Sequence, residues 1–387
     1  MNVRFINVIF IVLLYTSCCY GSSRQVANFA VNDTLSYHVL GKQQGNDIVI
    51  EDTINLMNKI CIVPESMKLV FKGGYIKNGT LIGNDTRLMS SKACFNKVKI
   101  QGSWNVPIIS TSLFGDLGYE NSLRDVVALA NPSVKNKIYI EAGKYQVTAQ
   151  KNGDVCIPVG SNTDFVLDGE ICLTPNGFRN YYIVQVTGEN IKISGKGTII
   201  GDKHTHTGTS GEWGMGIDVE DAHNVSIYGL TIKDCWGDCI YVGTESTDVN
   251  IYNCKLDHGR RQGISITSAN DVLIRNCLIS NVEGTNPQYA IDVEPNKNET
   301  VDNVVIENVT IYNCCGGILL YGKASNAKIG KVSIRNSIIN GVTKMPINLI
   351  KCESVEVRGC TFTRHDRSNP IRQEEVKSSI IKRNRVK

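Results

Sequence analysis

The sequence predicts an all-β chain that winds into a solenoid of stacked coils, with one short capping helix near its N-terminal end. From about Met215 onward one unit repeats: an apolar strand, a corner, a second short strand, a turn, and then Gly-Ile-x-Val/Ile. The last isoleucine of the units recurs at spacings of 23, 24, 27, 27 and 29 residues, at Ile217, Ile240, Ile264, Ile291, Ile318 and Ile347. A period of about 20 to 30 residues made of short strands is typical of a β-solenoid, in which each coil buries its apolar face against its neighbours.

Two further columns of residues share this register. A valine opens the other strand of each unit and an aliphatic residue follows two positions later, at Val225/Ile227, Val249/Ile251, Val272/Ile274, Val304/Ile306, Val332/Ile334 and Val355/Val357. An asparagine then marks one corner, at Asn253, Asn276, Asn308 and Asn336. Asparagine tolerates the left-handed backbone of a tight corner and can hydrogen-bond the asparagine of the next coil.

The remaining segments fit this architecture more loosely. Residues 22–115 predict irregular strands and initial coils. Residues 122–131 carry a helical pattern, with Leu123, Val126, Val127 and Ala130 at helical spacing. A helix over the open end of a solenoid would cover its exposed core and edge. We assign residues 116–370 to the solenoid and 371–387 to a basic, solvated C-terminal tail.

Residues 1–21 have the layout of a secretory signal. Met-Asn-Val-Arg precedes an apolar run from Phe5 to Tyr15 that only Asn7 interrupts. This run is too short to span a bilayer, which needs about 20 residues. We therefore expect an exported protein, either secreted, periplasmic or at the cell surface. Tyr15-Thr16-Ser17-Cys18 loosely resembles a bacterial lipobox, so either Cys18 carries a membrane-anchoring lipid or the signal is cleaved after Gly21.

Composition and charge exclude several classes of protein. Of the 387 residues, 42% are hydrophobic, 20% are charged and only 9 are proline, which argues against a disordered or collagen-like chain. The net charge is +4, but the last six residues alone carry four positive charges, at Lys382, Arg383, Arg385 and Lys387. The rest of the chain is neutral, so no nucleic-acid partner is expected.

The 14 cysteines do not indicate a metal site. Three of them, Cys254, Cys277 and Cys360, follow the asparagine corner. We interpret these as stacked, unpaired and buried, because free cysteine behaves as a small apolar residue. No pair has the CxxC spacing of a zinc site. A disulfide between neighbouring coils remains an alternative in an exported protein.

Several coils carry motifs of a known group of proteins. They include Gly216-Ile217-Asp218-Val219, Gly237-Asp238-Cys239-Ile240 and Gln262-Gly263-Ile264-Ser265-Ile266, after the stretch Ile191–Gly201. Together they resemble the right-handed parallel β-helix proteins of the pectin-lyase superfamily, and among those the polygalacturonase family, over about residues 115–365. The resemblance implies a right-handed parallel β-helix and a polysaccharide as the partner.

The catalytic motifs of the polygalacturonase family are mostly replaced in this chain. Asn-Thr-Asp, Asp-Asp, Gly-His-Gly and Arg-x-Lys would fall at 213–215, 237–238, 261–263 and 292–294. Met215 stands for the first Asp, Gly237-Asp238 for the Asp pair, Gln262 for the His, and Asp292-x-Glu294 for Arg-x-Lys. Only Asp238 is retained, so the resemblance does not carry over the family's mechanism.

Acidic residues take the place of those motifs in a pattern of their own. In Gly-Ile-Asp-Val-Glu and Ala-Ile-Asp-Val-Glu-Pro the Ile and Val face inward, so period-2 alternation points the acids outward, at Asp218, Glu220, Asp292 and Glu294. The expected catalytic residues are Asp238, Asp292 and Glu294. The expected substrate-binding residues are Asp218, Trp236, Tyr241, Arg260, Arg261, Gln262 and Tyr289. Aromatic faces stack on sugar rings, arginines bind carboxylates or hydroxyls, and acids transfer protons.

The first functional hypothesis is an exported, glycoside hydrolase-like enzyme that cleaves a polysaccharide. Asp292 and Glu294 lie two residues apart on one strand, so their carboxyl groups are expected about 6–8 Å apart. That separation suits an inverting mechanism. Asp238 is a second candidate acid, and Arg260 or Arg261 would hold a substrate carboxylate.

Two other hypotheses stay open. A polysaccharide lyase acting on uronate-containing chains would use an arginine or Tyr289 as base, and carboxylates would hold Ca²⁺. A polysaccharide-binding surface protein or adhesin without catalysis is the third, because the fold does not determine the function. His204 and His206 lie in a polar loop outside these candidate site residues and are expected at the surface.

Overall fold

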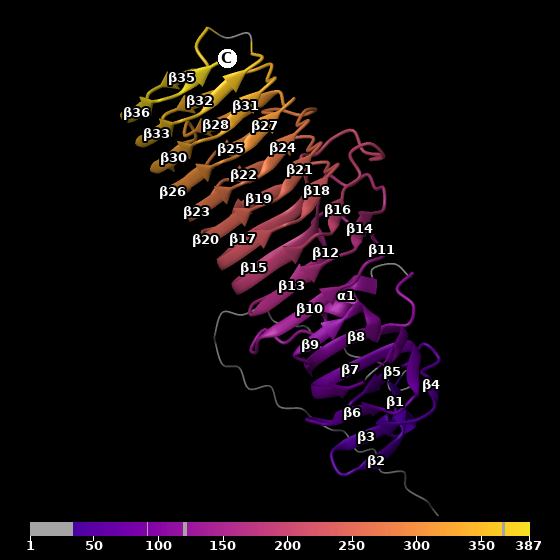
Figure 1. Cartoon of the computed structure of the whole chain (residues 1–387). Coiled ribbons are helices and arrows are strands. Elements are labelled where there is room, and N and C mark those ends of the chain that lie inside the picture. Colours follow the sequence, from indigo (N-terminus) through magenta and orange to yellow (C-terminus); the bar gives the residue numbers. More distant parts are fainter. Residues whose placement is uncertain (1–33, 91, 119–121, 366–367) are drawn as a thin grey trace, which may run out of the picture.

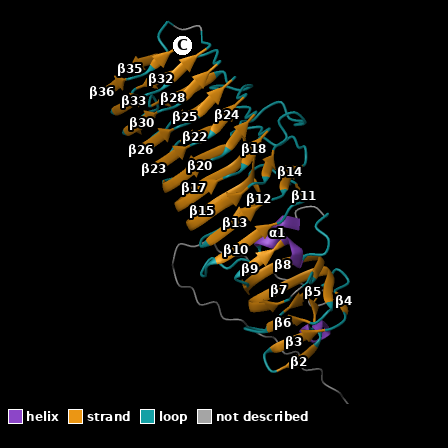
Figure 2. Ribbon diagram, in the orientation of Figure 1, coloured by secondary structure: helices purple, strands orange, loops and turns teal. Residues whose placement is uncertain are grey.

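Short strands with alternating apolar and polar residues wind the chain into a parallel β-helix that follows a smaller N-terminal sheet (Figure 1). The computed structural model describes residues 34–387 apart from 91, 119–121 and 366–367. Figure 2 shows the strands of successive coils stacked along one axis, with the helical segments in the N-terminal part. The all-β solenoid expected from the repeats is therefore confirmed. Within the described ranges, no helix is long and apolar enough to cross a membrane.

The N-terminal part is a sheet of eight strands. They are β1 (Thr34–Leu35), β2 (Lys42–Gln44), β3 (Asp47–Ile50), β4 (Thr53–Asn55), β5 (Ile60–Ile62), β6 (Lys68–Phe71), β7 (Tyr75–Met89) and β8 (Phe95–Asn105). Only β2 and β3 pair antiparallel among the described pairs of this sheet. The ring of Phe95 packs against Phe71, Trp104 and Phe114, so an aromatic core holds this sheet together. Two short 3-10 helices, η2 (Tyr37–Leu40) and η3 (Thr111–Leu113), flank the sheet.

The expected helix is shorter than its sequence pattern and does not cover an open end. Helix α1 spans Ser122–Val127, and the chain leaves the helical conformation before Pro132, which disfavours helical backbone in the residue before it. Helix α1 lies between the N-terminal sheet and the first coils of the β-helix (Figure 1). Leu123 and Val126 are fully buried, and Asp125 Oδ1 accepts a hydrogen bond from the Ile100 backbone at 2.9 Å. The helix therefore joins two β-structures.

Three parallel faces make up the β-helix. The first face consists of β12 (Asp154–Val159), the first halves of β15 (Asn180–Gly195) and β17 (Trp213–Tyr228), β19 (Ile240–Gly243), β22 (Ile264–Ile266), β25 (Tyr289–Val293), β28 (Gly316–Tyr321), β32 (Ile347–Ile350) and β35 (Ile371–Glu374). The long strands β15 and β17 continue around a corner into the second face.

The second and third faces complete each coil. The second face consists of β9 (Ile108–Ser110), β10 (Asn136–Ile140), β13 (Thr163–Leu167), the second halves of β15 and β17, β20 (Ser246–Tyr252), β23 (Ala269–Arg275), β26 (Thr300–Glu307), β29 (Lys328–Ile329), β30 (Lys331–Arg335), β33 (Ser354–Arg358) and β36 (Ser378–Lys382). The third face consists of β11 (Lys144–Val147), β14 (Glu170–Leu173), β16 (Thr198–Ile200), β18 (Thr231–Lys233), β21 (Lys255–Asp257), β24 (Leu278–Ser280), β27 (Thr310–Tyr312), β31 (Ile338–Asn340), β34 (Thr361–Thr363) and β37 (Arg385–Val386).

The repeat columns of the sequence are stacked columns in the core. Ile217, Ile240, Ile264, Ile291, Ile318 and Ile347 pair in one unbroken register, and each is 0% exposed. The valine column pairs in the same way on the second face. Complete burial of each such side chain stabilises the fold by about 1.5–3 kcal/mol, so the columns fix the register of neighbouring coils.

The corner residues behave as their composition predicts. Asn253, Asn276, Asn308 and Asn336 have φ values of 56°, 55°, 53° and 49°, in the left-handed region. Cys254, Cys277 and Cys360 follow this corner and are buried. All cysteines in the described part of the chain are free thiols. The cysteines that follow the corner therefore fill space in the core.

The C-terminal residues form a further coil, so the expectation of a solvated tail at 371–387 is wrong. Strands β35, β36 and β37 pair in parallel with β32, β33 and β34. No later coil stacks on them among the described residues, and the side chains of β36 are exposed. The basic residues that suggested a solvated tail therefore lie on this coil.

Gly195 offers a test of the close stacking between coils. It has φ +126°, and a Cβ atom there would lie 2.0 Å from the Leu167 carbonyl oxygen. Gly195→Ala should lower stability by about 1–3 kcal/mol, because both backbone strain and overpacking act at this corner. Thermal and denaturant unfolding measure the effect. Gly160→Ala is the matched control, because a Cβ atom there meets nothing within 4 Å. Equal stability of the two variants would contradict the packing at this corner.

Candidate functional site

A cavity of about 360 Å³ opens on the outer side of the first face. It lies over the strands β15, β17, β19, β22 and β25, and most of its lining is polar or aromatic. The lining residues are Tyr182, Trp213, Met215, Asp218, Glu220, Tyr241, Arg261, Ser265, Thr267, Asp292, Glu294 and Asn296. Two further cavities lie at the second face and beside α1.

One column of outward residues forms the floor of this cavity. Gln185, Asp218, Tyr241, Ser265 and Asp292 are consecutive register partners on β15, β17, β19, β22 and β25. They point away from the core because their neighbours on either side, such as Ile217 and Val219, point into it. Asp218 and Asp292 are three strand spacings apart, about 14 Å. The cavity therefore has two acidic ends.

Asp292 is held in place by a buried glutamine. It is 1% exposed, and its Oδ2 accepts a hydrogen bond from Gln262 Nε2 at 2.7 Å. Gln262 Oε1 in turn accepts from the Tyr289 backbone at 2.8 Å. Burial, together with the charge of neighbouring Glu294, raises the pKa of Asp292 well above its ordinary value. Asp292 Oδ1 has no hydrogen-bond partner, so a protonated Asp292 is available to a ligand in the cavity.

Asp238 anchors the one arginine of the lining. It is fully buried, and its Oδ2 accepts hydrogen bonds from Ser265 Oγ at 2.7 Å and Arg261 Nη1 at 3.2 Å. Burial raises the pKa of Asp238, although Arg261 acts in the opposite direction. Arg261 Nε also lies 3.4 Å from Glu212 Oε2. Asp238 itself is not part of the lining, so its contacts serve to position Arg261 and Ser265.

Asp218 and Glu220 occupy the other end of the cavity. Asp218 is 0% exposed, and its Oδ2 accepts a hydrogen bond from Gln185 Nε2 at 2.9 Å. Burial and the charge of Glu220 raise the pKa of Asp218 to about 8. Burial also raises the pKa of Glu220, which is half-buried. Asp218 is therefore mostly protonated at neutral pH.

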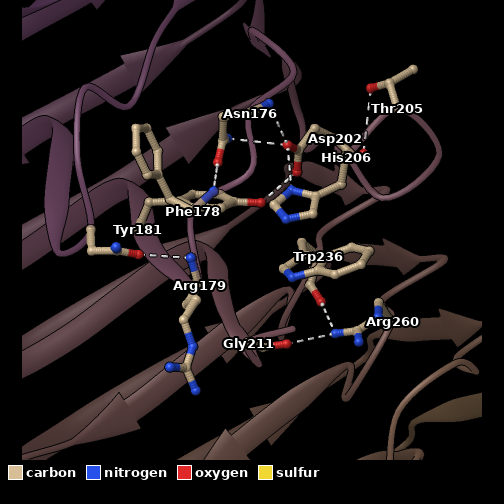
Figure 3. Close-up of polar contacts among 11 residues, drawn as sticks. Asn176, Phe178, Arg179, Tyr181, Asp202, Thr205, His206, Gly211, Trp236 and Arg260 are labelled. Carbon is tan, nitrogen blue, oxygen red and sulfur yellow. Dashed lines mark hydrogen bonds and ion pairs between the residues drawn. The ribbon is translucent and has the colours of Figure 1, made fainter. Parts of the chain in front are cut away.

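Trp236 and Arg260 do not line the cavity but hold the loop beside it (Figure 3). The Trp236 ring stacks on the His206 ring with a centroid distance of 3.8 Å. The Arg260 guanidinium packs over the same Trp236 ring, 3.7 Å from its centroid. Arg260 Nη1 donates to the carbonyl oxygens of Gly211 at 3.0 Å and Trp236 at 3.2 Å. Their packing and hydrogen bonds hold the loop 201–212, which leads to Trp213 at the cavity.

Asp202 fixes the same loop from its other side. His206 Nδ1 lies 2.9 Å from Asp202 Oδ2, and the Tyr181 hydroxyl donates to Asp202 Oδ1 (Figure 3). The Asn176 backbone and side chain both donate to Asp202 Oδ2 at 3.1 Å. The side chain of His206 is fully buried, so its expected surface position is wrong. The reason is the stack between Tyr181 and Trp236, which sequence spacing does not reveal.

The cavity brings together half of the residues expected from the sequence. Asp218, Tyr241, Arg261, Asp292 and Glu294 line it, and Asp238 and Gln262 bond to lining residues from behind. Trp236, Arg260 and Tyr289 lie outside the lining; Tyr289 is 6% exposed and its ring packs against the backbone of Gly316. The acids point outward as predicted, but Asp218 and Asp292 are buried within the cavity.

Sequence reasoning missed several lining residues, above all Tyr182, Thr267 and Asn296. Tyr182 is the register partner of Met215, so extending the alignment one coil toward the N-terminus would have found it. Thr267 follows the strand β22 and its Oγ1 lies 2.8 Å from the Tyr241 hydroxyl. The described residues contain no group of three or more His, Cys, Asp or Glu side chains arranged to hold a metal ion.

Two curated proteins are similar in sequence to part of this chain. The uncharacterized protein YclG of Bacillus subtilis (strain 168) is 32% identical over 207 residues, which cover 46% of this chain and 35% of YclG. The SPbeta prophage-derived uncharacterized protein YorA of the same organism is 30% identical over 210 residues, with coverages of 48% and 36%. The chain thus spans about a third of the length of these relatives.

The chain is also similar to a solved structure and to a family model. The structure of the Yersinia enterocolitica Family 28 exopolygalacturonase aligns with 13% identity and a TM-score of 0.40, over 71% of this chain and 78% of that one. A family model described as "Right handed beta helix region" matches residues 171–331. Together with the observed coils, this match confirms that the chain forms a right-handed parallel β-helix, the fold that its resemblance to the pectin-lyase superfamily implies.

Proposed function

We propose that the protein is a carbohydrate-active enzyme that hydrolyses a glycosidic bond of a polysaccharide in the cavity on the first face. The observation that carries the proposal is the pair Asp292 and Glu294. Asp292 is buried, its pKa is raised, and its Oδ1 has no hydrogen-bond partner. Glu294, which directly follows the strand β25, is half-buried. Two carboxyl groups in different environments are what acid–base hydrolysis requires.

The chemistry follows from the placement of these two groups. Asp292 would donate its proton to the glycosidic oxygen as the bond from that oxygen to the anomeric carbon breaks. Glu294 would accept a proton from a water molecule whose oxygen forms the new bond to the same carbon. The two residues lie two positions apart on the chain, and a direct side-chain interaction with Glu294 helps to raise the pKa of Asp292, which keeps the transferable proton on Asp292.

The surrounding residues would orient the sugar chain. Tyr182, Trp213 and Tyr241 supply aromatic surfaces, and Trp213 is 49% exposed at the edge of the cavity. Gln262 holds Asp292 through a 2.7 Å hydrogen bond. The glutamine amide donates to Asp292 Oδ2, which leaves Oδ1 as the site of the transferable proton.

The geometry favours hydrolysis over the lyase alternative. The lyase hypothesis names Tyr289 or an arginine as the base, but Tyr289 lies outside the lining and burial raises its pKa. Arg260 is bound to backbone carbonyl groups, and Arg261 is paired with Asp238 and Glu212. Binding without turnover, as in an adhesin, is distinguished by the assay below.

Asp292→Asn and Glu294→Gln should each lower the rate of cleavage by about 10²–10⁴-fold, because each removes one proton-transfer group. The assay incubates the protein with plant, algal, fungal and bacterial polysaccharides and measures reducing ends, with ultraviolet absorbance as the readout for elimination. Glu189→Gln, an exposed carboxylate on β15 outside the cavity, is the control. Full activity in both cavity variants, or elimination products, would contradict the mechanism.

The raised pKa of Asp218 predicts a pH-dependent effect on stability. In the folded protein the pKa of Asp218 is about 8, whereas its ordinary value is 3.8. The contribution of protonated Asp218 to stability is therefore complete below pH 3.8 and is lost as the pH rises from there through 8. Asp218→Asn, which cannot ionise, should gain stability relative to the wild type by up to about 1.4 kcal/mol per pH unit across that interval. Thermal unfolding from pH 4 to pH 9 measures it. A difference between the two proteins that does not change with pH would contradict a raised pKa.

Export is the third part of the proposal and concerns residues 1–21 and Cys18, which lie outside the described residues. The apolar run after Met-Asn-Val-Arg supports it. Mass spectrometry of the N-terminus of the protein expressed in a bacterial host should show either a lipidated Cys18 or a chain that begins after Gly21. Cys18→Ala should abolish membrane attachment in the first case only. An intact N-terminus in the cytoplasm would contradict export.

A further inference from the structure

One end of the cavity combines two carboxyl groups and aromatic rings without a basic partner. Asp218 and Glu220 both line it, and none of the ion pairs among the described residues includes either of them. Asp218 is 0% exposed and its Oδ1 has no hydrogen-bond partner. A buried carboxyl oxygen without a partner costs free energy that a ligand can recover.

Two tyrosines complete this end. Tyr182 comes from β15 and Tyr241 from β19, so the rings reach the acids from the strands on either side of β17. Burial raises the pKa of each tyrosine to about 12, and the carboxyl groups of Asp218 and Glu220 act in the same direction. Both tyrosines line the cavity together with the two acids. Aromatic faces carry negative potential, which adds to that of the carboxyl groups.

The only basic residue of the lining, among the described residues, is already paired. Arg261 Nη1 bonds Asp238 and its Nε lies 3.4 Å from Glu212. A uronate carboxylate in this cavity would meet Asp218, Glu220, Asp292 and Glu294 without a free cation to balance it. The uronate would gain no cationic partner there, whereas an ammonium group would favour the ionised forms of the buried acids and pair with them.

We propose, resting on the proposed function, that Asp218, Glu220, Tyr182 and Tyr241 form a subsite for the ammonium group of an amino sugar. The substrate would then be a polysaccharide that contains free amino sugars, and the subsite would lie about three strand spacings from the reacting bond, ~14 Å. Carboxylates and aromatic faces together are the groups that bind a desolvated ammonium ion. This replaces the sequence-based hypothesis that Arg260 or Arg261 holds an acidic substrate.

The test compares three sugar probes on a variant that cannot turn them over. In the Asp292→Asn background, isothermal titration calorimetry measures binding of the tetramers of glucosamine, N-acetylglucosamine and galacturonic acid in mildly acidic buffer. The glucosamine tetramer should bind at least about tenfold more tightly than the acetylated one, and the galacturonate tetramer should bind most weakly. An added Asp218→Asn or Glu220→Gln change should abolish the preference, whereas Glu189→Gln should leave it intact.

Proton release gives a readout that a merely structural role of Asp218 would not change. An ammonium group beside Asp218 favours its ionised form, so binding of the glucosamine tetramer near neutral pH should release a proton. The measured enthalpy should then vary with the ionisation enthalpy of the buffer, and this variation should disappear with Asp218→Asn. Glu220→Gln provides the same comparison of affinities should Asp218→Asn fail to fold.

The outcomes separate this inference from the proposed function. Equal or tighter binding of the acetylated or the galacturonate tetramer, or a preference that survives Asp218→Asn and Glu220→Gln, would overturn the ammonium subsite. Hydrolysis of a different glycan by the wild type would leave the proposed function standing in that case. Conversely, preferential binding of the glucosamine tetramer without cleavage of any substrate would support the subsite and contradict the hydrolase.

Discussion

In-register stacking of parallel strands is the constraint on which the rest of this structure depends. Because coils lie about 4.8 Å apart, each outward position meets the same position of the next coil. The inward isoleucine column secures this register, since every member is completely buried. The same register aligns Gln185, Asp218, Tyr241, Ser265 and Asp292 on the outside and continues with Leu319 on β28. An apolar residue there is consistent with a polar floor that ends after Asp292.

The stacked acids share one arrangement that is costly for stability and useful for chemistry. Asp218, Asp238 and Asp292 are each buried, each has one oxygen that accepts a hydrogen bond, and each has one oxygen without a partner. Buried polar atoms without partners cost free energy and are rare in proteins. Two of them line one cavity and the third bonds to its lining from behind, which is the arrangement that the proposed ligand site rests on.

The sequence predicted those parts of the structure that depend on local periodicity. Alternation placed Asp218 and Asp292 on the outside of the helix, and the asparagine corners have the expected left-handed backbone. The sequence could not show that loop 201–212 leads to the cavity. The position of this loop depends on the stack of His206, Trp236 and Arg260, which come from segments distant in the sequence. For the same reason Trp236 and Arg260 were expected to contact a sugar. The coil of β35, β36 and β37 escaped detection because the valine column does not continue into it: Ser379 is the register partner of Val355.

The outward column of this β-helix is acidic at the position where the sequence resemblance to the polygalacturonase family would place Arg-x-Lys. Asp292-x-Glu294 stands there, so the resemblance implies a reversal of charge. Arg261 is the one basic group of the described lining, and Asp238 and Glu212 neutralise it. A coil tolerates such a reversal because outward side chains do not enter the core that fixes the register. The chemistry of the outward column can therefore change while the fold persists, which is the basis of the proposed preference for a cationic sugar.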